Sequence, residues 1–212
     1  MIAESTDPSR AALLILHMQP PLTALPGGDE LVSRVANAAD TARRNGIRVL
    51  YINVGFRPGY PELSADDALQ LITVPHNALI DGVSNAVHEA LAPRDGDLQF
   101  VNRGNNAFYG CDLDCYLRLN DINHIVITGV ATGGVVMGTV TDADDRNYAV
   151  TVLSDGVLDP NPILHEQLLD LFTKPARAVR VISIQQWFDE LAVRARISQV
   201  DIDEPMSVRE VS

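Results

Sequence analysis

Six short apolar stretches alternate along the chain with longer stretches whose apolar residues recur at helical spacing. The apolar stretches are residues 11–17, 48–54, 97–101, 124–129, 148–154 and 178–184. Several are apolar at nearly every position, which is typical of strands buried on both faces of a parallel sheet. The helical stretches are expected near residues 29–45, 82–91, 111–120, 134–146, 160–173 and 185–196.

This alternation predicts an α/β fold, a doubly wound and mostly parallel six-stranded sheet with helices on both faces. Asn45-Gly46 predicts a helix end, and Asp159 before Pro160 predicts a helix start. We expect a single domain over residues 1–212, with a core from about 10 to 194 and a polar tail over 195–212. The Pro- and Gly-rich connection over 55–81 is long enough to be a functional loop or lid.

Composition narrows the classes of partner. The net charge of −12 argues against a nucleic-acid or anionic-membrane surface, although one local Arg could still bind an anionic substrate. No signal peptide opens the chain, and no apolar run approaches the roughly 20 residues of a membrane span. Two cysteines, Cys111 and Cys115, are too few for a disulfide framework. We therefore expect a soluble, cytoplasmic protein.

Three separated segments should meet at one end of the sheet. In a doubly wound sheet of order 3-2-1-4-5-6, ligands bind at the carboxyl ends of the strands, where the first and fourth strands are neighbours. The first strand ends at His17, the third ends beside Asn102 and Arg103, and the fourth ends at Gly129. The glycine-rich turn "GVATGGVV" that follows could aim backbone N–H groups at a developing negative charge. It offers no nucleophile.

These segments resemble the isochorismatase-like hydrolases, the superfamily that includes cysteine amidohydrolases such as nicotinamidases. The segments are "ALLILHMQPPL", "NRGNNAFYGCDLDCYLR" and "IVITGVATGGVVMGTVTDADDRNYAVTVLSDGVLD", and "VGFRPGYPEL" and "DPNPILHE" are similar to segments of one subgroup. The resemblance covers roughly residues 10–190. It implies the six-stranded sheet of order 3-2-1-4-5-6, a small-molecule substrate, a cis peptide between Val130 and Ala131, and a homodimer or higher homo-oligomer.

The catalytic Asp, Lys and Cys of that family fall on His17, Asn102 and Val135. A valine cannot form a thioester, so covalent amidase chemistry at this position is excluded. Family members that hydrolyse a vinyl ether also lack the cysteine and use the Asp as a proton donor. Here only His17, with a reference pKa near 6.5, could act as acid or base. The alternative is a core histidine bonded to the backbone.

The other candidate site residues each have a functional and a structural interpretation. Arg103 could hold a carboxylate or be a solvated surface residue, and Asn102 could donate to a carbonyl or cap a loop. The segment after the second strand has no His for the nicotinamidase-type metal, and no glycine fingerprint follows the first strand, so we expect neither a metal nor another cofactor. The remaining candidate substrate-binding residues are Gln19, Phe56, Arg57, Phe108, Val130, Ala131, Thr132, Gly133 and Gly134.

Two functions follow from this set. The first is a hydrolase of a small amide or vinyl ether that works by water attack, without a cysteine nucleophile, with His17 as acid or base. The second is a catalytically inactive family member that binds a small molecule or acts in regulation. Both use the same crevice.

Overall fold

The structure, a computed structural model, describes residues 7–64, 66–67, 69, 73–174 and 179–203 of the chain, with side chains only to residue 196. Its sheet has six strands in the order β3-β2-β1-β4-β5-β6, and all neighbouring pairs are parallel. This confirms the predicted fold class and strand order. The strands are β1 (Ala11–Leu16), β2 (Arg48–Val54), β3 (Leu98–Asn102), β4 (His124–Val130), β5 (Ala149–Leu158) and β6 (Val179–Ile182).

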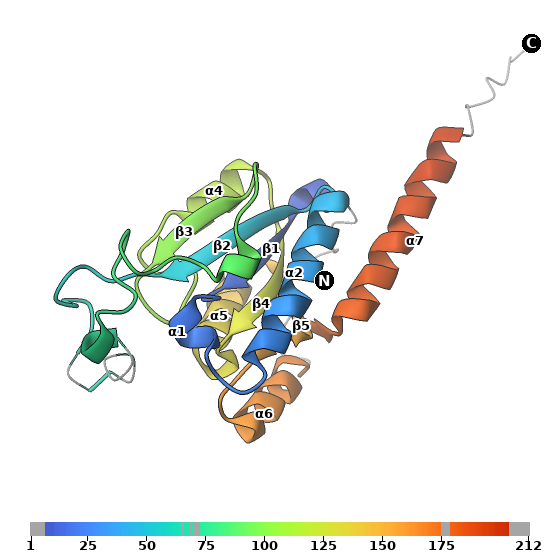
Figure 1. The fold of residues 1–212 in the computed structure, drawn as a ribbon. Helices are drawn as coiled ribbons and strands as arrows, with labels where there is room; N and C mark the ends of the chain where they lie inside the picture. Colours follow the sequence, from blue (N-terminus) through green and yellow to red (C-terminus); the bar gives the residue numbers. More distant parts are fainter. Residues whose placement is uncertain (1–6, 65, 68, 70–72, 175–178, 204–212) are drawn as a thin grey trace, which may run out of the picture.

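Helices cover both faces of the sheet, as Figure 1 shows. Helices α2 (Gly28–Arg44) and α7 (Ile184–Asp203) pack on the face that receives alternate β1 side chains such as Leu13. Helices α4 (Leu113–Leu119), α5 (Met137–Asp145) and α6 (Pro162–Phe172) pack on the face that receives Leu14. Because successive strand side chains point to opposite faces, a strand covered on both sides must be apolar throughout. Every residue of β1 is buried.

One predicted helix end is confirmed, and two other helix boundaries differ from expectation. Asn45 ends α2 and Gly46 follows at a φ of 71°, as predicted. Helix α6 begins instead at Pro162 and is capped by Asn161, whose side chain accepts from two backbone N–H groups, and not by Asp159. Helix α7 runs to Asp203, so part of the predicted tail is helical; residues 204–212 lie outside the described part.

The helix expected over 82–91 is wrong. Only a three-residue 3-10 turn, Glu89–Leu91, forms there. Ser84 and Asn85 use their side chains to accept from the backbone N–H groups of Ile80 and Gly82. Such bonds compete with the helical ladder and favour turns.

The connection over 55–81 extends from the sheet as a separate lobe (Figure 1). It has a small core of its own, in which Phe56, Tyr60 and Leu79 are buried. The Tyr60 hydroxyl lies within hydrogen-bond distance of two carbonyls of this lobe. The short helix α1 (Pro20–Thr23) follows β1 and contributes Leu22 to this core.

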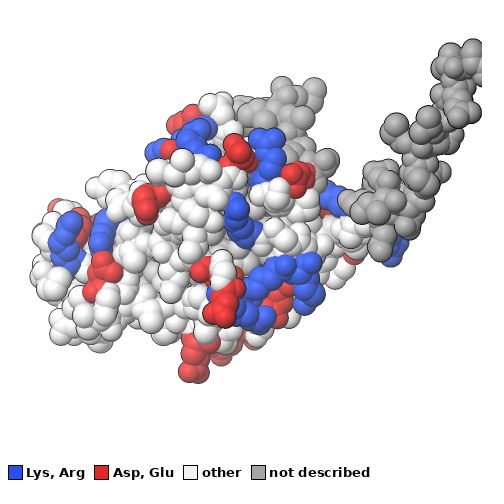
Figure 2. Space-filling model, turned by 90° about the horizontal axis from the view of Figure 1, so that it is seen from above, with Lys and Arg blue, Asp and Glu red and all other residues white. Residues whose placement is uncertain are grey.

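Charged side chains of both signs are interspersed on the face drawn in Figure 2, with uncharged surface between them. Several charged side chains of the described residues form ion pairs, as in the Arg43–Asp97 bridge of 2.6 Å. In the part of the chain that the structure describes, none of the helices combines the length and apolarity needed to cross a bilayer.

Candidate functional site

His17 and Asn102 meet at the carboxyl ends of β1 and β3. The two side chains are joined by a 2.9 Å hydrogen bond between His17 Nε2 and Asn102 Oδ1, and both residues are buried. His17 has a φ of 54°, a left-handed backbone conformation that residues other than glycine rarely adopt. Its backbone N–H donates to the carbonyl of Ile52, which fixes this turn beside β2. The ends of the first and third strands therefore meet as expected, and the turn after the fourth strand lines the same cavity as His17.

The surroundings of Asn102 determine which nitrogen of His17 carries the proton. Asn102 Nδ2 donates to the carbonyls of Gly104 at 2.7 Å and Asn106 at 2.8 Å. The remaining amide atom, Oδ1, can only accept, so His17 Nε2 must be the donor. In a neutral imidazole this leaves Nδ1 with a lone pair. Within the described residues no hydrogen bond reaches His17 Nδ1, and His17 lines a cavity.

Burial lowers the pKa of His17 from 6.5 to about 4, because the charged imidazolium loses its hydration. The hydrogen bond to Asn102 raises the pKa only in part. The titration near neutral pH that the sequence led us to expect is therefore displaced toward acid. At neutral pH the His17 ring is uncharged. Its Nδ1 can accept a proton, but the ring does not act as an acid.

The cavity beside His17 has a volume of about 390 Å³. Only His17 and Asn105 contribute polar side chains among its described lining residues. The segment after β1 contributes Pro21, Leu22, Ala24 and Leu25. The turn after β4 contributes Val130, Ala131 and Gly134, and Leu69 and Pro160 complete the lining. An apolar enclosure with a few polar atoms is typical of small-molecule sites.

The turn after β4 directs most of its polar groups into the protein. The Val130-Ala131 peptide is cis, as the resemblance implies. The Gly133 N–H donates to Asp159 Oδ2 at 2.6 Å, and the Gly134 N–H donates to the Ala131 carbonyl at 3.0 Å. Two amides of the expected anion-stabilising turn are thus already engaged.

The side chains of this turn are also enclosed. Thr132 Oγ1 lies 2.8 Å from His165 Nδ1, and Thr132 is fully buried. Val135, at the position of the family's cysteine, is fully buried in the core beneath α4, α5 and α6 and does not line the cavity. A side chain at position 135 therefore packs into the core.

Arg103 and Gln19 hold loops in place. Arg103 donates to the Gly55 carbonyl at 2.6 Å and forms a 2.7 Å ion pair with Asp81. Gln19 is fully buried and exchanges hydrogen bonds with the backbone of Val54, while also donating to the Asn85 carbonyl. These contacts fasten the 55–85 segment to β1 and β3. Neither side chain lines the cavity.

The other predicted residues outside the cavity are Phe56, Arg57 and Phe108. Phe56 lies in the core of the 55–81 lobe. Arg57 is 68% exposed and pairs with Glu62 at 2.7 Å. Phe108 stacks on Tyr148 with ring centroids 5.8 Å apart. The structure thus gathers His17, Asn102, Val130, Ala131 and Gly134 at the cavity, by lining it or by holding a lining residue, and leaves these three apart.

Asn105 is the polar residue of the described cavity lining that the sequence analysis missed, together with the apolar lining residues Pro21, Leu22, Ala24, Leu25, Leu69 and Pro160. It lies in a loop without hydrophobic periodicity, so the only available signal was its position three residues after Asn102. Among the residues the structure describes, no cluster of three or more His, Cys, Asp or Glu could hold a metal ion.

Comparison with known proteins places these features in a family. The family model described as the Isochorismatase domain matches residues 11–186. The chain is 30% identical over 145 residues to ureidoacrylate amidohydrolase of Methylorubrum extorquens, a match covering 62% of this chain and 58% of that protein. It is 25% identical over 169 residues to N-carbamoylsarcosine amidase of an Arthrobacter species, covering 78% and 64%. The chain thus spans less than two thirds of the length of either relative.

Solved structures share the fold over nearly their whole length. A cysteine hydrolase from Pseudomonas syringae superposes with a TM-score of 0.77 at 19% identity, covering 88% of this chain and 94% of that one. An isochorismatase family protein from Burkholderia thailandensis gives a TM-score of 0.75 at 25% identity, covering 87% and 96%. The shared fold therefore extends over most of this chain.

Proposed function

This chain belongs to the isochorismatase family, and from that premise we propose that it hydrolyses a small, neutral, amide-type molecule without a covalent intermediate. The observation that carries the proposal is the His17–Asn102 pair, which presents an unprotonated imidazole nitrogen at an apolar cavity. His17 acts as the base that activates water, and Asn102 positions it. The sequence already excludes thioester formation at Val135.

The reaction is written for a carbonyl bonded to nitrogen. His17 Nδ1 takes a proton from water while the water oxygen bonds to the carbonyl carbon. The C–N bond then breaks, and the proton passes from His17 to the leaving nitrogen. A base with a pKa of about 4 is weak, but nearly all of it is in the basic form at neutral pH.

Hydrolysis of a vinyl ether is less well supported, although the resemblance includes it. That reaction begins with protonation of a carbon atom, which needs an acid. Because burial lowers the pKa of His17 to about 4, little imidazolium is present at neutral pH. The cavity therefore suits attack on a carbonyl better than protonation of an alkene.

A neutral substrate is proposed because the described lining contains no charged side chain. Arg103, the candidate for binding a carboxylate, is already bonded to Asp81 and Gly55. The relatives named ureidoacrylate amidohydrolase and N-carbamoylsarcosine amidase suggest carbamoyl and amide compounds as the first to examine. Burying a carboxylate here without a partner would be costly.

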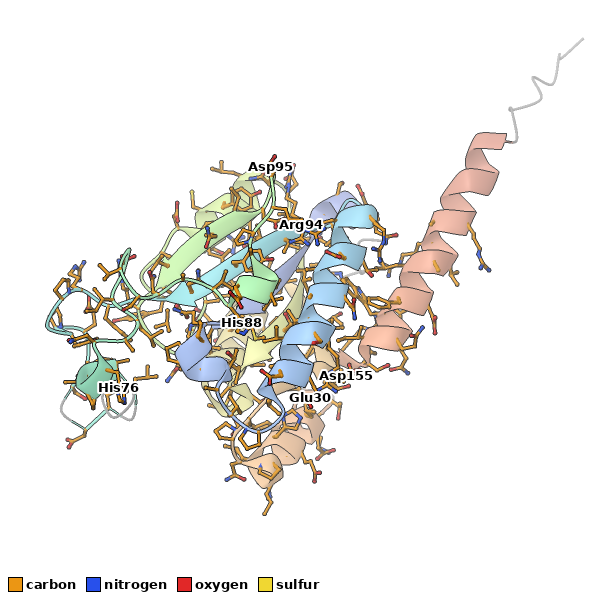
Figure 3. All side chains as sticks on the ribbon, in the orientation of Figure 1. Glu30, His76, His88, Arg94, Asp95 and Asp155 are labelled. Atoms are coloured by element: carbon orange, nitrogen blue, oxygen red, sulfur yellow. The ribbon has the colours of Figure 1, made fainter. Side chains whose placement is uncertain are left out.

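The test is a hydrolysis screen of small amides, ureas, N-carbamoyl compounds and vinyl ethers. The parent protein is compared with His17→Ala and with the control His76→Ala, because His76 is exposed on the 55–81 lobe and does not line the cavity (Figure 3). We expect turnover of an amide-type compound, a loss of about 10²–10⁴-fold in His17→Ala, and no change in the control. An active His17→Ala variant would contradict the role of His17.

A second candidate function is ligand binding without turnover. The engaged amides of Gly133 and Gly134 and the burial of Val135 favour it, because all three positions belong to the turn that carries the family's nucleophile. In this case no compound is hydrolysed, yet one binds equally well to the parent protein and to His17→Ala. That result would replace the hydrolase proposal.

A further inference from the structure

We propose that the side-chain amide of Asn105 donates the hydrogen bond that holds the carbonyl oxygen of the substrate. This assignment rests on the hydrolytic function proposed above and deepens it, because it names the group that polarises the carbonyl. The juxtaposition that carries it is the Asn105 amide beside Gly134, within the same cavity that His17 lines.

Among the side chains that line the cavity, elimination of the other donors leads to Asn105. A carbonyl oxygen that gains negative charge during water attack needs a hydrogen-bond donor. His17 uses its N–H on Asn102, and its other ring nitrogen can only accept. The amides of Gly133 and Gly134 donate within the protein. Among the described lining residues, Asn105 therefore has the single side chain whose N–H donors are not already hydrogen-bonded.

The Asn105 amide lies over the part of the turn that is open to the cavity. A Cβ built on Gly134 would come within 3.4 Å of Asn105 Oδ1 and 3.9 Å of the Ala131 Cβ. These are ordinary contact distances, so Gly134 leaves a small space between the turn and the amide. We assign that space to the substrate carbonyl.

The amide is available and its backbone is held. Within the described residues, the Asn105 side chain makes no hydrogen bond, so its Nδ2 can rotate toward a ligand. The residues on either side are fixed, because Asn102 donates to the carbonyls of both Gly104 and Asn106. A Cβ at Gly138 would lie 2.0 Å from the Asn105 carbonyl, which shows how closely α5 packs against this loop.

Asn102 thereby links the two groups of the reaction. Its Oδ1 orients the base His17, and its Nδ2 holds the loop that carries the donor Asn105. The amide stabilises an oxygen that becomes negative, whereas the described lining offers no cation to a substrate that enters as an anion, and burying an unpaired carboxylate is costly. The site therefore selects a neutral carbonyl compound, an amide or a urea, over a carboxylate of the same shape.

Binding is tested first, with benzamide as the carbonyl probe and toluene as its counterpart without a carbonyl. Dissociation constants come from NMR titrations of the parent protein, Asn105→Ala, Asn105→Asp and the control Gln185→Ala, which removes an exposed amide on α7. We expect benzamide to bind about 3- to 10-fold more weakly to both Asn105 variants, with toluene and the control unchanged. Asn105→Asp keeps the shape of the side chain and removes its donor.

Several results would overturn the assignment. Equal benzamide affinity in the parent protein and Asn105→Ala is one, and an equal loss for toluene is another, since it indicates a change of cavity shape. Failure of the parent protein to bind benzamide at millimolar concentration also overturns it. Thermal unfolding midpoints confirm that each variant is folded.

Kinetics separates this inference from the hydrolase proposal. With an amide that the parent protein hydrolyses, Asn105→Ala should lower kcat by about 10- to 100-fold and change KM much less, because the charge on the oxygen develops in the transition state. Unchanged kcat would remove Asn105 from the reaction and leave His17 in place. Benzamide binding that depends on Asn105, without turnover of any compound, would retain the carbonyl contact and reject the hydrolase.

Discussion

The cavity wall that β1 and β3 build has polar groups without a hydrogen-bond partner among the described residues. On the wall built by the turn after β4, most polar groups are already hydrogen-bonded within the protein. On the first wall, His17 Nδ1 and the Asn105 amide have no partner among the described residues. On the second, Gly133 donates to Asp159 and Thr132 contacts His165. Val135 on that turn belongs to the core.

This difference indicates where chemistry is still possible. The turn retains the shape implied by the family resemblance, including the cis Val130-Ala131 peptide, but its polar groups hold the turn itself. The opposite wall combines a positioned acceptor with a rotatable donor. Variants of the first wall should therefore affect function most, and variants of the turn should affect mainly stability.

The largest effect is expected for Asn102→Leu, which removes the side chain that bonds His17 and the 104–106 loop on the wall built by β1 and β3. The substitution leaves His17 Nε2–H and the carbonyls of Gly104 and Asn106 without their partner. We expect the free energy of unfolding to fall by about 3 kcal/mol or more and turnover to fall at least as far as in His17→Ala. Urea unfolding and a rate assay measure the two. In the control Asn120→Leu only one bond, to the Tyr116 carbonyl, is lost, so full activity is expected.

The next effect is the dependence of stability on pH. The pKa of His17 is about 4 in the folded protein and about 6.5 in the unfolded chain, so the unfolded chain binds the proton first as pH falls. Stability from this residue is complete above about pH 6.5 and decreases by about 3 kcal/mol toward pH 4. His17→Gln, which does not titrate, should lack this component.

Urea unfolding of both proteins at about pH 7 and about pH 4.5 measures the difference, because their other ionisable groups are the same. Turnover by the parent protein should be constant from neutral pH down to about pH 5 and then fall with an apparent pKa of about 4. Parallel stability curves for the two proteins would show that His17 is not buried as a neutral ring.

The sequence was sufficient for the sheet because burial on both faces imposes apolar runs that a reader can count. It was also sufficient to bring His17 and Asn102 together, since the carboxyl ends of parallel strands lie along the same edge of the sheet, here with β2 between β1 and β3. The helix expected over 82–91 failed for a local reason. Side chains of Ser84 and Asn85 bond to backbone N–H groups, and hydrophobic periodicity does not report such bonds.

The details of the site depend on contacts between distant residues. Arg103 is adjacent to Asn102 in sequence, yet its partner Asp81 lies in another loop, so its spacing could not distinguish a substrate ligand from a clamp. The pKa of His17 follows from its burial, which a sequence does not give. Asn105 entered the site because Asn102 fixes the carbonyls on both sides of it.

A smaller effect is expected for Asp159→Ala on the turn. Asp159 accepts from the N–H groups of Gly133 at 2.6 Å and Asn161 at 2.9 Å. Loss of these bonds should lower the free energy of unfolding by about 1–2 kcal/mol and weaken benzamide binding less than Asn105→Ala does. Asp155→Ala is the matched control, because Asp155 accepts from the Ile184 N–H at the start of α7 (Figure 3). A larger loss of binding than in Asn105→Ala would reverse the comparison of the two walls.

The smallest effect is expected for Val135→Cys, which restores the family's residue type at the nucleophile position. Because Val135 is fully buried among core side chains, the new sulfur should reach neither the cavity nor solvent. We expect a stability loss of about 1 kcal/mol, unchanged turnover and no acylated protein in mass spectra after incubation with the amide panel.

Cys115 is exposed and serves as an internal standard for iodoacetamide, while Cys111 is half-buried with its pKa raised by burial and should react more slowly. Labelling of Cys115 alone, with activity retained, is the expected pattern in the native protein. An acyl adduct on the introduced sulfur would show that the turn can still present a nucleophile, and the division between the two walls would then fail.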